Sequence, residues 1–102
     1  LYSIRLEPLS NCAYLRCLTI VSNSTLDEID LTPLSECNNL EKLRLFSNNI
    51  SSIDLSPIQD LETLELLELH NNPLDSATCV QVCDFITTHP QCDVLSDCNC
   101  GD

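Results

Sequence analysis

The sequence repeats itself about every 24 residues. The clearest copy, residues 40–50, reads L-x-x-L-x-L-x-x-N-x-I, and the pattern returns 24 residues later in residues 64–74. Another copy starts at Leu15, 25 residues before the clearest one, because one extra residue follows Asn23. A single repeat of this length cannot bury its apolar side chains alone. The period therefore predicts a solenoid in which neighbouring repeats stack into one core.

Each repeat should start with a short strand that pairs in parallel with the strand of the next repeat. The leucines at its first, fourth and sixth positions should point inward, and the residues between them should face solvent. Asn23, Asn48 and Asn72 then turn the chain, and their side chains can bond backbone groups of neighbouring turns. We expect these residues to form an asparagine ladder, with Asn23 buried like the other two.

The segments that return to the next strand are also repetitive, and two of them contain the pattern I-D-L-T/S-P-L/I. Thr32 and Ser56 can each cap a helix that has proline at its first position, and Gln59 could complete a capping box. The pattern predicts short helices or 3-10 turns at 33–38 and 57–62. Four of their side chains should point inward: Leu34, Cys37, Ile58 and Leu61.

The period stops after Leu74, and a helix is predicted at 76–88, ended by Pro90. We expect Phe85 to be partly exposed at the edge of its polar face. The inward arc of this helix should hold Cys79, Val82, Cys83 and Ile86, and the outer arc Thr78, Gln81, Asp84 and Thr88. The predicted organisation is therefore repeats in residues 1–75, starting near 15, 40 and 64 after a partial first repeat, and a disulfide-stapled cap in residues 76–102.

Eight cysteines in 102 residues favour an oxidising, extracytoplasmic compartment, with buried reduced thiols in a cytosolic protein as the alternative. Cys12 and Cys37 fall in the same inward column, where they are either small buried side chains or a disulfide. A zinc site made by four of the cap cysteines is the alternative to disulfides there, although their spacing fits no common zinc module. At least two bridges are expected among five cap cysteines: Cys79, Cys83, Cys92, Cys98 and Cys100.

Residues 1–75 resemble the leucine-rich repeat family, in a 24-residue form whose I-D-L-S-P-L segment is similar to microbial repeats. The resemblance implies an α/β solenoid with a parallel sheet on one face, short helical or 3-10 turns on the other and a C-terminal helical cap. It also implies binding of a protein partner through the strand face. The N-P-W and C-x-C opening of animal caps is absent, which argues against animal receptor roles.

The outward positions of the three strands form columns on this face, which combines three of the four basic residues with an aromatic side chain. Phe46, in a column with Val21 and His70, is an anchor of the type found in binding hot spots. The alternative is a merely solvated face with cross-strand ion pairs. The predicted protein-binding residues are Arg16, Thr19, Val21, Lys42, Arg44, Phe46, Leu66, Glu68 and His70.

Composition and motifs exclude several other functions. A net charge of −12 disfavours nucleic acid, and no apolar run is long enough for a membrane span. His70 and His89 have no nucleophile arranged beside them, and a chain with one glycine has no phosphate-binding loop. We therefore predict no catalysis, no cofactor and no metal. Asn49, in the sequon Asn-Ile-Ser, is a glycosylation candidate on an extracellular or cell-surface protein.

A second functional class is a structural subunit of a self-assembling extracellular array or filament. The sequence begins where a preceding strand would just have ended, so an upstream segment or another copy of the chain should cover that end. In a stacked oligomer, the contact is expected at residues 1–18.

Overall fold

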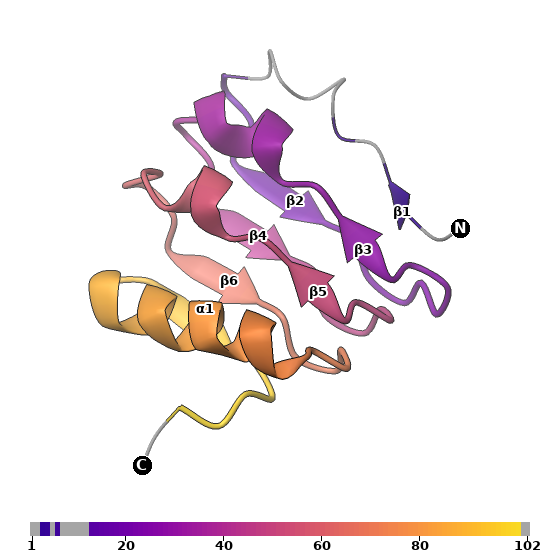
Figure 1. Cartoon of the computed structure of the whole chain (residues 1–102). Helices are drawn as coiled ribbons and strands as arrows, with labels where there is room; N and C mark the ends of the chain where they lie inside the picture. Colours follow the sequence, from indigo (N-terminus) through magenta and orange to yellow (C-terminus); the bar gives the residue numbers. More distant parts are fainter. Residues whose placement is uncertain (1–2, 5, 7–12, 101–102) are drawn as a thin grey trace.

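Two parallel sheets enclose the core in the computed structural model, which describes residues 3–4, 6 and 13–100 (Figure 1). The first sheet has the order β1-β3-β5 and the second the order β2-β4-β6-β7. The first is formed by β1 (Ser3–Ile4), β3 (Glu28–Ile29) and β5 (Ser52–Ile53). The second is formed by β2 (Cys17–Thr19), β4 (Lys42–Arg44), β6 (Leu66–Glu68) and β7 (Asp93–Leu95). The fold is the predicted α/β solenoid.

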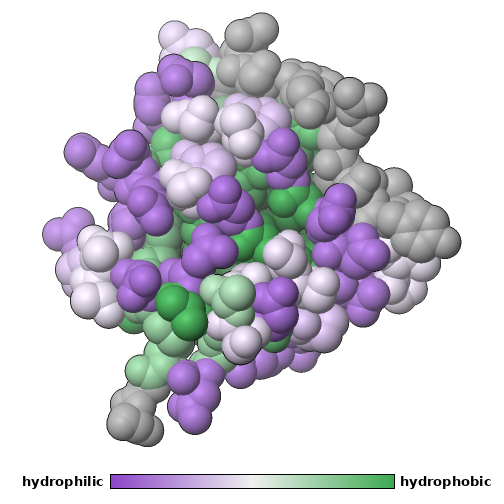
Figure 2. Space-filling view, viewed as in Figure 1, coloured by the Kyte–Doolittle hydropathy of each residue, from purple (hydrophilic) through white to green (hydrophobic). Residues whose placement is uncertain are grey.

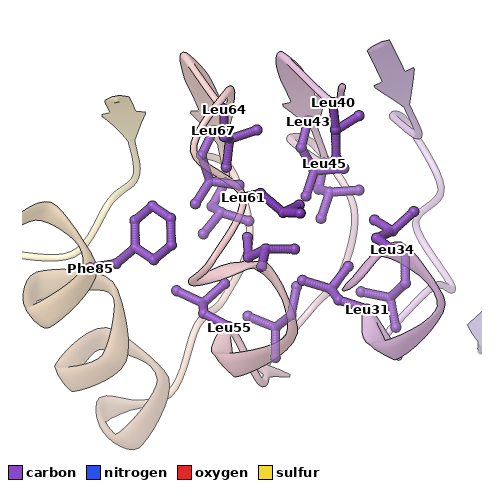
Figure 3. Packing of buried hydrophobic residues seen from close by; sticks show 14 of the residues in the cluster. Leu31, Leu34, Leu40, Leu43, Leu45, Leu55, Leu61, Leu64, Leu67 and Phe85 are labelled. Carbon is purple, nitrogen blue, oxygen red and sulfur yellow. The ribbon is translucent and has the colours of Figure 1, made fainter. Parts of the chain in front are cut away.

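The repeat period sets the register of both sheets. Leu18 aligns with Leu43 and Leu43 with Leu67, while Ile29 aligns with Ile53. Because the period is nearly constant, equivalent side chains of successive repeats stack in columns. Leucines from the strands and from the return segments meet between the two sides of the solenoid (Figure 3), and most of them are fully buried.

Two 3-10 helices, η2 (Thr32–Glu36) and η3 (Ser56–Ile58), form the predicted turns, and the four side chains expected to point inward are buried. The predicted caps are wrong. The cap residues are Leu31 and Leu55, neither of which makes a side-chain cap. Instead, the aspartate of each I-D-L segment accepts a bond from the backbone N–H two residues later, at 3.0 Å in both repeats. Aspartate favours this local turn, so it performs the task that we assigned to the hydroxyl residues and to Gln59.

The terminal helix α1 (Ser76–Thr88) has the predicted bounds but turns a different face to the core. Its buried residues are Thr78, Val82 and Phe85, whereas Ile86 is 37% exposed. Cys79 and Cys83 share one face of the helix, are only half-buried and both bond to the tail. The core face is therefore rotated toward the polar arc, and Phe85 points into the last repeat (Figure 3).

The tail after α1 is tied to the helix by two disulfides, Cys79–Cys98 and Cys83–Cys100. These bridges use the four sulfur atoms that a cap zinc site would have required. Cys92 is buried, and burial, followed by the nearby Asp93 carboxylate, raises the pKa of its thiol to about 11. Cys37 is buried, while Cys12, with its proposed bridge, lies outside the described residues, as do residues 7–11 of the first return segment. Among the helices described, none combines the length and apolar composition of a membrane crossing.

Candidate protein-binding face

The outward side of the β2-β4-β6-β7 sheet, with the residues that directly flank its strands, is called the strand face below. Parallel pairing aligns its outward side chains across four strands. The strand β7 was not predicted, and it adds Asp93 and Leu95 to this face. The only signal for β7 in the sequence is the inward pair Cys92 and Val94 around Asp93, which is too short to stand out. Two columns cross the sheet, Cys17–Lys42–Leu66–Asp93 and Thr19–Arg44–Glu68–Leu95.

Ion pairs occupy part of the strand face. Arg16 donates to both carboxylate oxygens of Glu41 from Nε and Nη2, each at 3.1 Å. The Nε of Arg44 lies 3.9 Å from Oε1 of Glu68, and this nitrogen is buried without a hydrogen-bond partner in the described chain. Lys42 is exposed and has no ion pair among the described residues. An exposed pair such as Arg16–Glu41 contributes at most about 1 kcal/mol to stability, whereas the Arg44–Glu68 pair is more buried.

An aromatic pair lies beside these charges. The rings of Phe46 and His70 stack with their centroids 4.8 Å apart and their planes at 6°. Both side chains and that of Val21 are half-buried. Next to this pair is a hollow of about 340 Å³, lined by His70, Val94, Leu95 and Ser96. The structure thus brings an aromatic platform, an apolar hollow and three basic side chains onto one face.

The ends of the strands are held by the asparagines. Asn48 Nδ2 donates to the carbonyls of Ile20 and Leu45, at 2.8 and 2.7 Å, and its Oδ1 accepts from the Asn23 N–H at 3.0 Å. Asn72 makes the same kind of contacts one repeat further on, accepting from the N–H of Asn48 at 3.1 Å. Asn48 and Asn72 are buried, but Asn23 is only half-buried, so the expected burial of Asn23 is wrong. Its side chain instead donates to the Val21 carbonyl at 3.0 Å.

Each turn needs one residue in the left-handed region. Ser22, Ser47 and Asn71 have φ values of 62°, 60° and 59°, and each directly precedes a ladder asparagine. The N–H of Asn71 donates to the Asp97 carboxylate at 2.7 Å, which connects the last turn to the tail. The turns therefore place Val21, Phe46 and His70 at matching positions beside the sheet.

Charge is unevenly distributed over the chain. All four basic residues lie at or before Arg44, whereas ten of the sixteen acidic residues come after it. On the strand face, Arg16 directly precedes β2, and Lys42 and Arg44 lie on β4. The side formed by β6 and β7 is acidic. The face that carries α1, β3 and β5 is mostly hydrophilic, with small apolar patches (Figure 2).

His89, the second histidine of the chain, contacts both the end of α1 and the repeats. His89 stacks on buried Phe85 at 3.9 Å and its Nε2 lies 2.7 Å from the Gln59 carbonyl, so it ties α1 to the repeats. A second hollow of about 410 Å³ lies beside it, near Leu61 and Glu62. No cluster of potential metal ligands occurs in the described part of the chain. Cys17 is exposed on the strand face, and Asn49 is exposed one residue beyond the ladder.

These observations agree with the comparison to known families. The leucine-rich repeat family model matches residues 13–74, and the chain belongs to this family. Leucine-rich repeats are in general non-catalytic modules for protein–protein interaction, whose curved repeat surface binds the partner. No curated protein sequence matches the chain.

Two solved structures show the same fold. Internalin C2 of Listeria monocytogenes aligns with a TM-score of 0.64 and 24% identity, covering 90% of this chain and 36% of its own. A leucine-rich repeat protein of Leptospira interrogans aligns with a TM-score of 0.72 and 21% identity, covering 90% and 22%. This chain therefore spans only about a third and a fifth of these two proteins, and the likeness concerns the fold alone.

Proposed function

We propose that the chain recognises a protein partner through the strand face and catalyses no reaction. The observation that carries the proposal is the stacked pair of Phe46 and His70 beside an apolar hollow, on a face that also carries the exposed Lys42. Partly exposed aromatic and arginine side chains on a rigid face are the groups that contribute most to protein interfaces. The proposed contact residues are Arg16, Thr19, Val21, Lys42, Arg44, Phe46, Leu66, Glu68 and His70.

The rigidity of this face supports the proposal. The ladder asparagines fix the strand ends, and the Arg16–Glu41 pair restrains one long side chain. A preorganised face loses less conformational entropy when a partner binds. A partner can therefore be bound without reorganisation of the repeats.

The proposed location is extracellular or on the cell surface. Two disulfides in a small domain are typical of proteins that fold in an oxidising environment, and cytosolic thiols are normally kept reduced. Asn49 is proposed as a glycan acceptor in hosts that glycosylate secreted proteins, because its side chain is exposed.

Replacement of Phe46 tests the binding proposal. Phe46→Ala removes half of the aromatic stack, so we expect partner binding to weaken about tenfold or more, about 1.4 kcal/mol, with little change in melting temperature. The measurement is the amount of protein that each immobilised variant captures from the culture medium or the surface extract of cells that produce the chain. The matched control is Val80→Ala, since Val80 is 61% exposed on α1, away from the strand face. Equal capture by both variants would show that the strand face is not the binding surface.

A further inference from the structure

The strand β7 is the last strand of its sheet, and its outer edge pairs with no other strand of the described chain. We propose that the partner contributes an extended basic segment that pairs with β7 and becomes the fifth strand of the sheet. This inference rests on the proposed function, because it specifies which part of a protein partner binds and where.

The pairing pattern leaves one side of β7 open. The N–H of Asp93 donates to the Glu65 carbonyl at 2.8 Å, and the Leu95 carbonyl accepts from the Leu69 N–H at 2.7 Å. In a parallel ladder the intervening residue directs its N–H and C=O away from that neighbour. Val94 therefore points its backbone N–H and C=O away from β6, toward the free edge of the sheet, and no backbone bond reaches them among the described residues. Such an edge is a template for an added strand.

An apolar contact lies beside the free edge. The hollow of about 340 Å³ is lined by the ring of His70 and by three consecutive residues of the edge, Val94, Leu95 and Ser96. Leu95 is 47% exposed, a larger exposed fraction than that of the half-buried Val21 and Leu66 on the same face. A strand added along β7 would place alternate side chains above this face, and one apolar side chain could fill the hollow.

The negative charge of the β7 edge favours a basic partner segment. Asp93 and Asp97 are exposed two residues before and two residues after Leu95, and Glu65 directly precedes the adjacent strand β6. No Lys or Arg occurs after Arg44. On an added strand, a basic residue beside Asp93 or Asp97 and an apolar residue beside Leu95 lie on the same face, two residues apart. A segment of the pattern Lys-x-Leu-x-Lys is therefore complementary to this edge, whereas an acidic segment is repelled. The same carboxylates disfavour the β7 edge of a second copy of the chain, which carries the same charges.

Two designed peptides test the inference on the oxidised full chain. The basic probe is acetyl-Lys-Thr-Lys-Thr-Leu-Thr-Lys-amide, which carries its lysines and its leucine on one face of the strand, and the matched control replaces every Lys by Glu. Amide hydrogen exchange and backbone NMR shifts at physiological salt are the measurements. We expect the basic probe to protect the Val94 N–H and to shift β7 resonances, and the acidic probe to do neither.

Substitutions at Val94 separate backbone pairing from general charge attraction. Val94→Pro removes the outward N–H without removing a bond to β6, so binding of the basic probe should weaken about tenfold. Val94→Ala keeps the N–H and should bind nearly as well as the unaltered chain. If Val94→Pro alters the circular dichroism spectrum, Leu95→Ala provides the second variant, because it removes the apolar contact beside the edge, leaves the backbone and the charge unchanged, and should also weaken binding of the basic probe.

The inference is overturned if Val94→Pro binds the basic probe as well as Val94→Ala, or if the Val94 N–H gains no protection. It is also overturned if both probes bind equally, which would indicate attachment unrelated to charge. Its failure and that of the proposed function are distinguishable. Loss of capture in Phe46→Ala together with an unprotected Val94 would retain the strand face and reject the edge, whereas the reverse result would retain the edge alone.

Discussion

Asn48 shows how one residue can hold two neighbouring repeats together. Its amide donates to the carbonyls of Leu45 in its own repeat and Ile20 in the preceding one, and its oxygen accepts from Asn23. A strand that ends at a turn leaves such backbone groups without strand partners, and burial of an unsatisfied group is costly. Asparagine fits because it carries a donor and an acceptor on one short side chain.

Asn48→Ala should therefore lower the free energy of unfolding by about 1–3 kcal/mol, since it takes the side-chain partner from the Ile20 carbonyl and from the Asn23 N–H, while the Leu45 carbonyl keeps its bond from Asn72. Asn49→Ala is the control, because Asn49 is exposed and its bond to the Leu26 carbonyl comes from its backbone N–H, which alanine retains. Urea denaturation of both variants supplies the measurement. A similar loss at the two positions would contradict the role assigned to the ladder.

At the scale of the element, α1 ends the β1-β3-β5 sheet with side chains in place of a strand. The Ile53 N–H donates to Thr78 Oγ1 at 3.3 Å, and Gln81 bonds both the Leu55 N–H at 3.0 Å and the Ile53 carbonyl at 3.1 Å. The edge of β5 is thus satisfied without a further repeat. This explains why the polar residues Thr78 and Gln81 face the last repeat.

Gln81→Leu should destabilise the chain by about 1–3 kcal/mol, because two backbone groups at the β5 edge lose their partners while the side-chain volume hardly changes. Gln91→Leu makes the same change at an exposed position and should be nearly neutral. Thermal unfolding followed by circular dichroism compares the two variants. Equal melting temperatures would show that water replaces the Gln81 contacts without cost.

The N-terminus of α1 adds a pH dependence. The Asp75 carboxylate accepts from the Thr78 N–H at 2.8 Å, and bonding to the Thr78 backbone, followed by its side chain, lowers the pKa of Asp75 below 3.8. A lowered pKa in the folded state stabilises the fold above the unfolded value and loses this effect as pH falls through the folded value. Asp75→Ala should therefore melt below the parent chain at pH 7, and the difference should shrink as the pH falls below 3.8 through the lower pKa of the folded state. A difference that persists unchanged in acid would exclude the charged cap.

The periodic residues were enough to predict the repeat fold, because columns such as Leu18, Leu43 and Leu67 recur where the packing requires them. The orientation of α1 was not predictable in this way. Hydrophobicity alone favoured Ile86 over Thr78, but hydrogen bonds to β5 determine which side is buried. The strand β7 was missed because three residues carry too little periodicity, and its pairing comes from the disulfide-tied tail.

At the scale of the whole molecule, charge changes from repeat to repeat along the solenoid, from basic residues in the early repeats to acidic residues near the cap. The three basic residues that the structure describes belong to the β2–β4 side of the strand face, and acidic residues dominate toward β7 and the cap. Neighbouring repeats contact each other mainly in sequence order, so a change at the cap acts first on the last repeat. The cap is therefore the element through which the stability of the whole array can be tested from one end.

Removal of the Cys83–Cys100 bridge by a double Cys→Ser substitution should lower the free energy of unfolding by about 2–4 kcal/mol, since it releases a closed loop in the unfolded chain. Because the array is nearly one-dimensional, hydrogen exchange should accelerate most in α1 and β7, less in β6 and least in β4. Cys17→Ser, which removes an exposed thiol from the strand face, is the control and should change neither quantity. Uniform acceleration across β4, β6 and β7 would show instead that cap and repeats unfold as one cooperative unit.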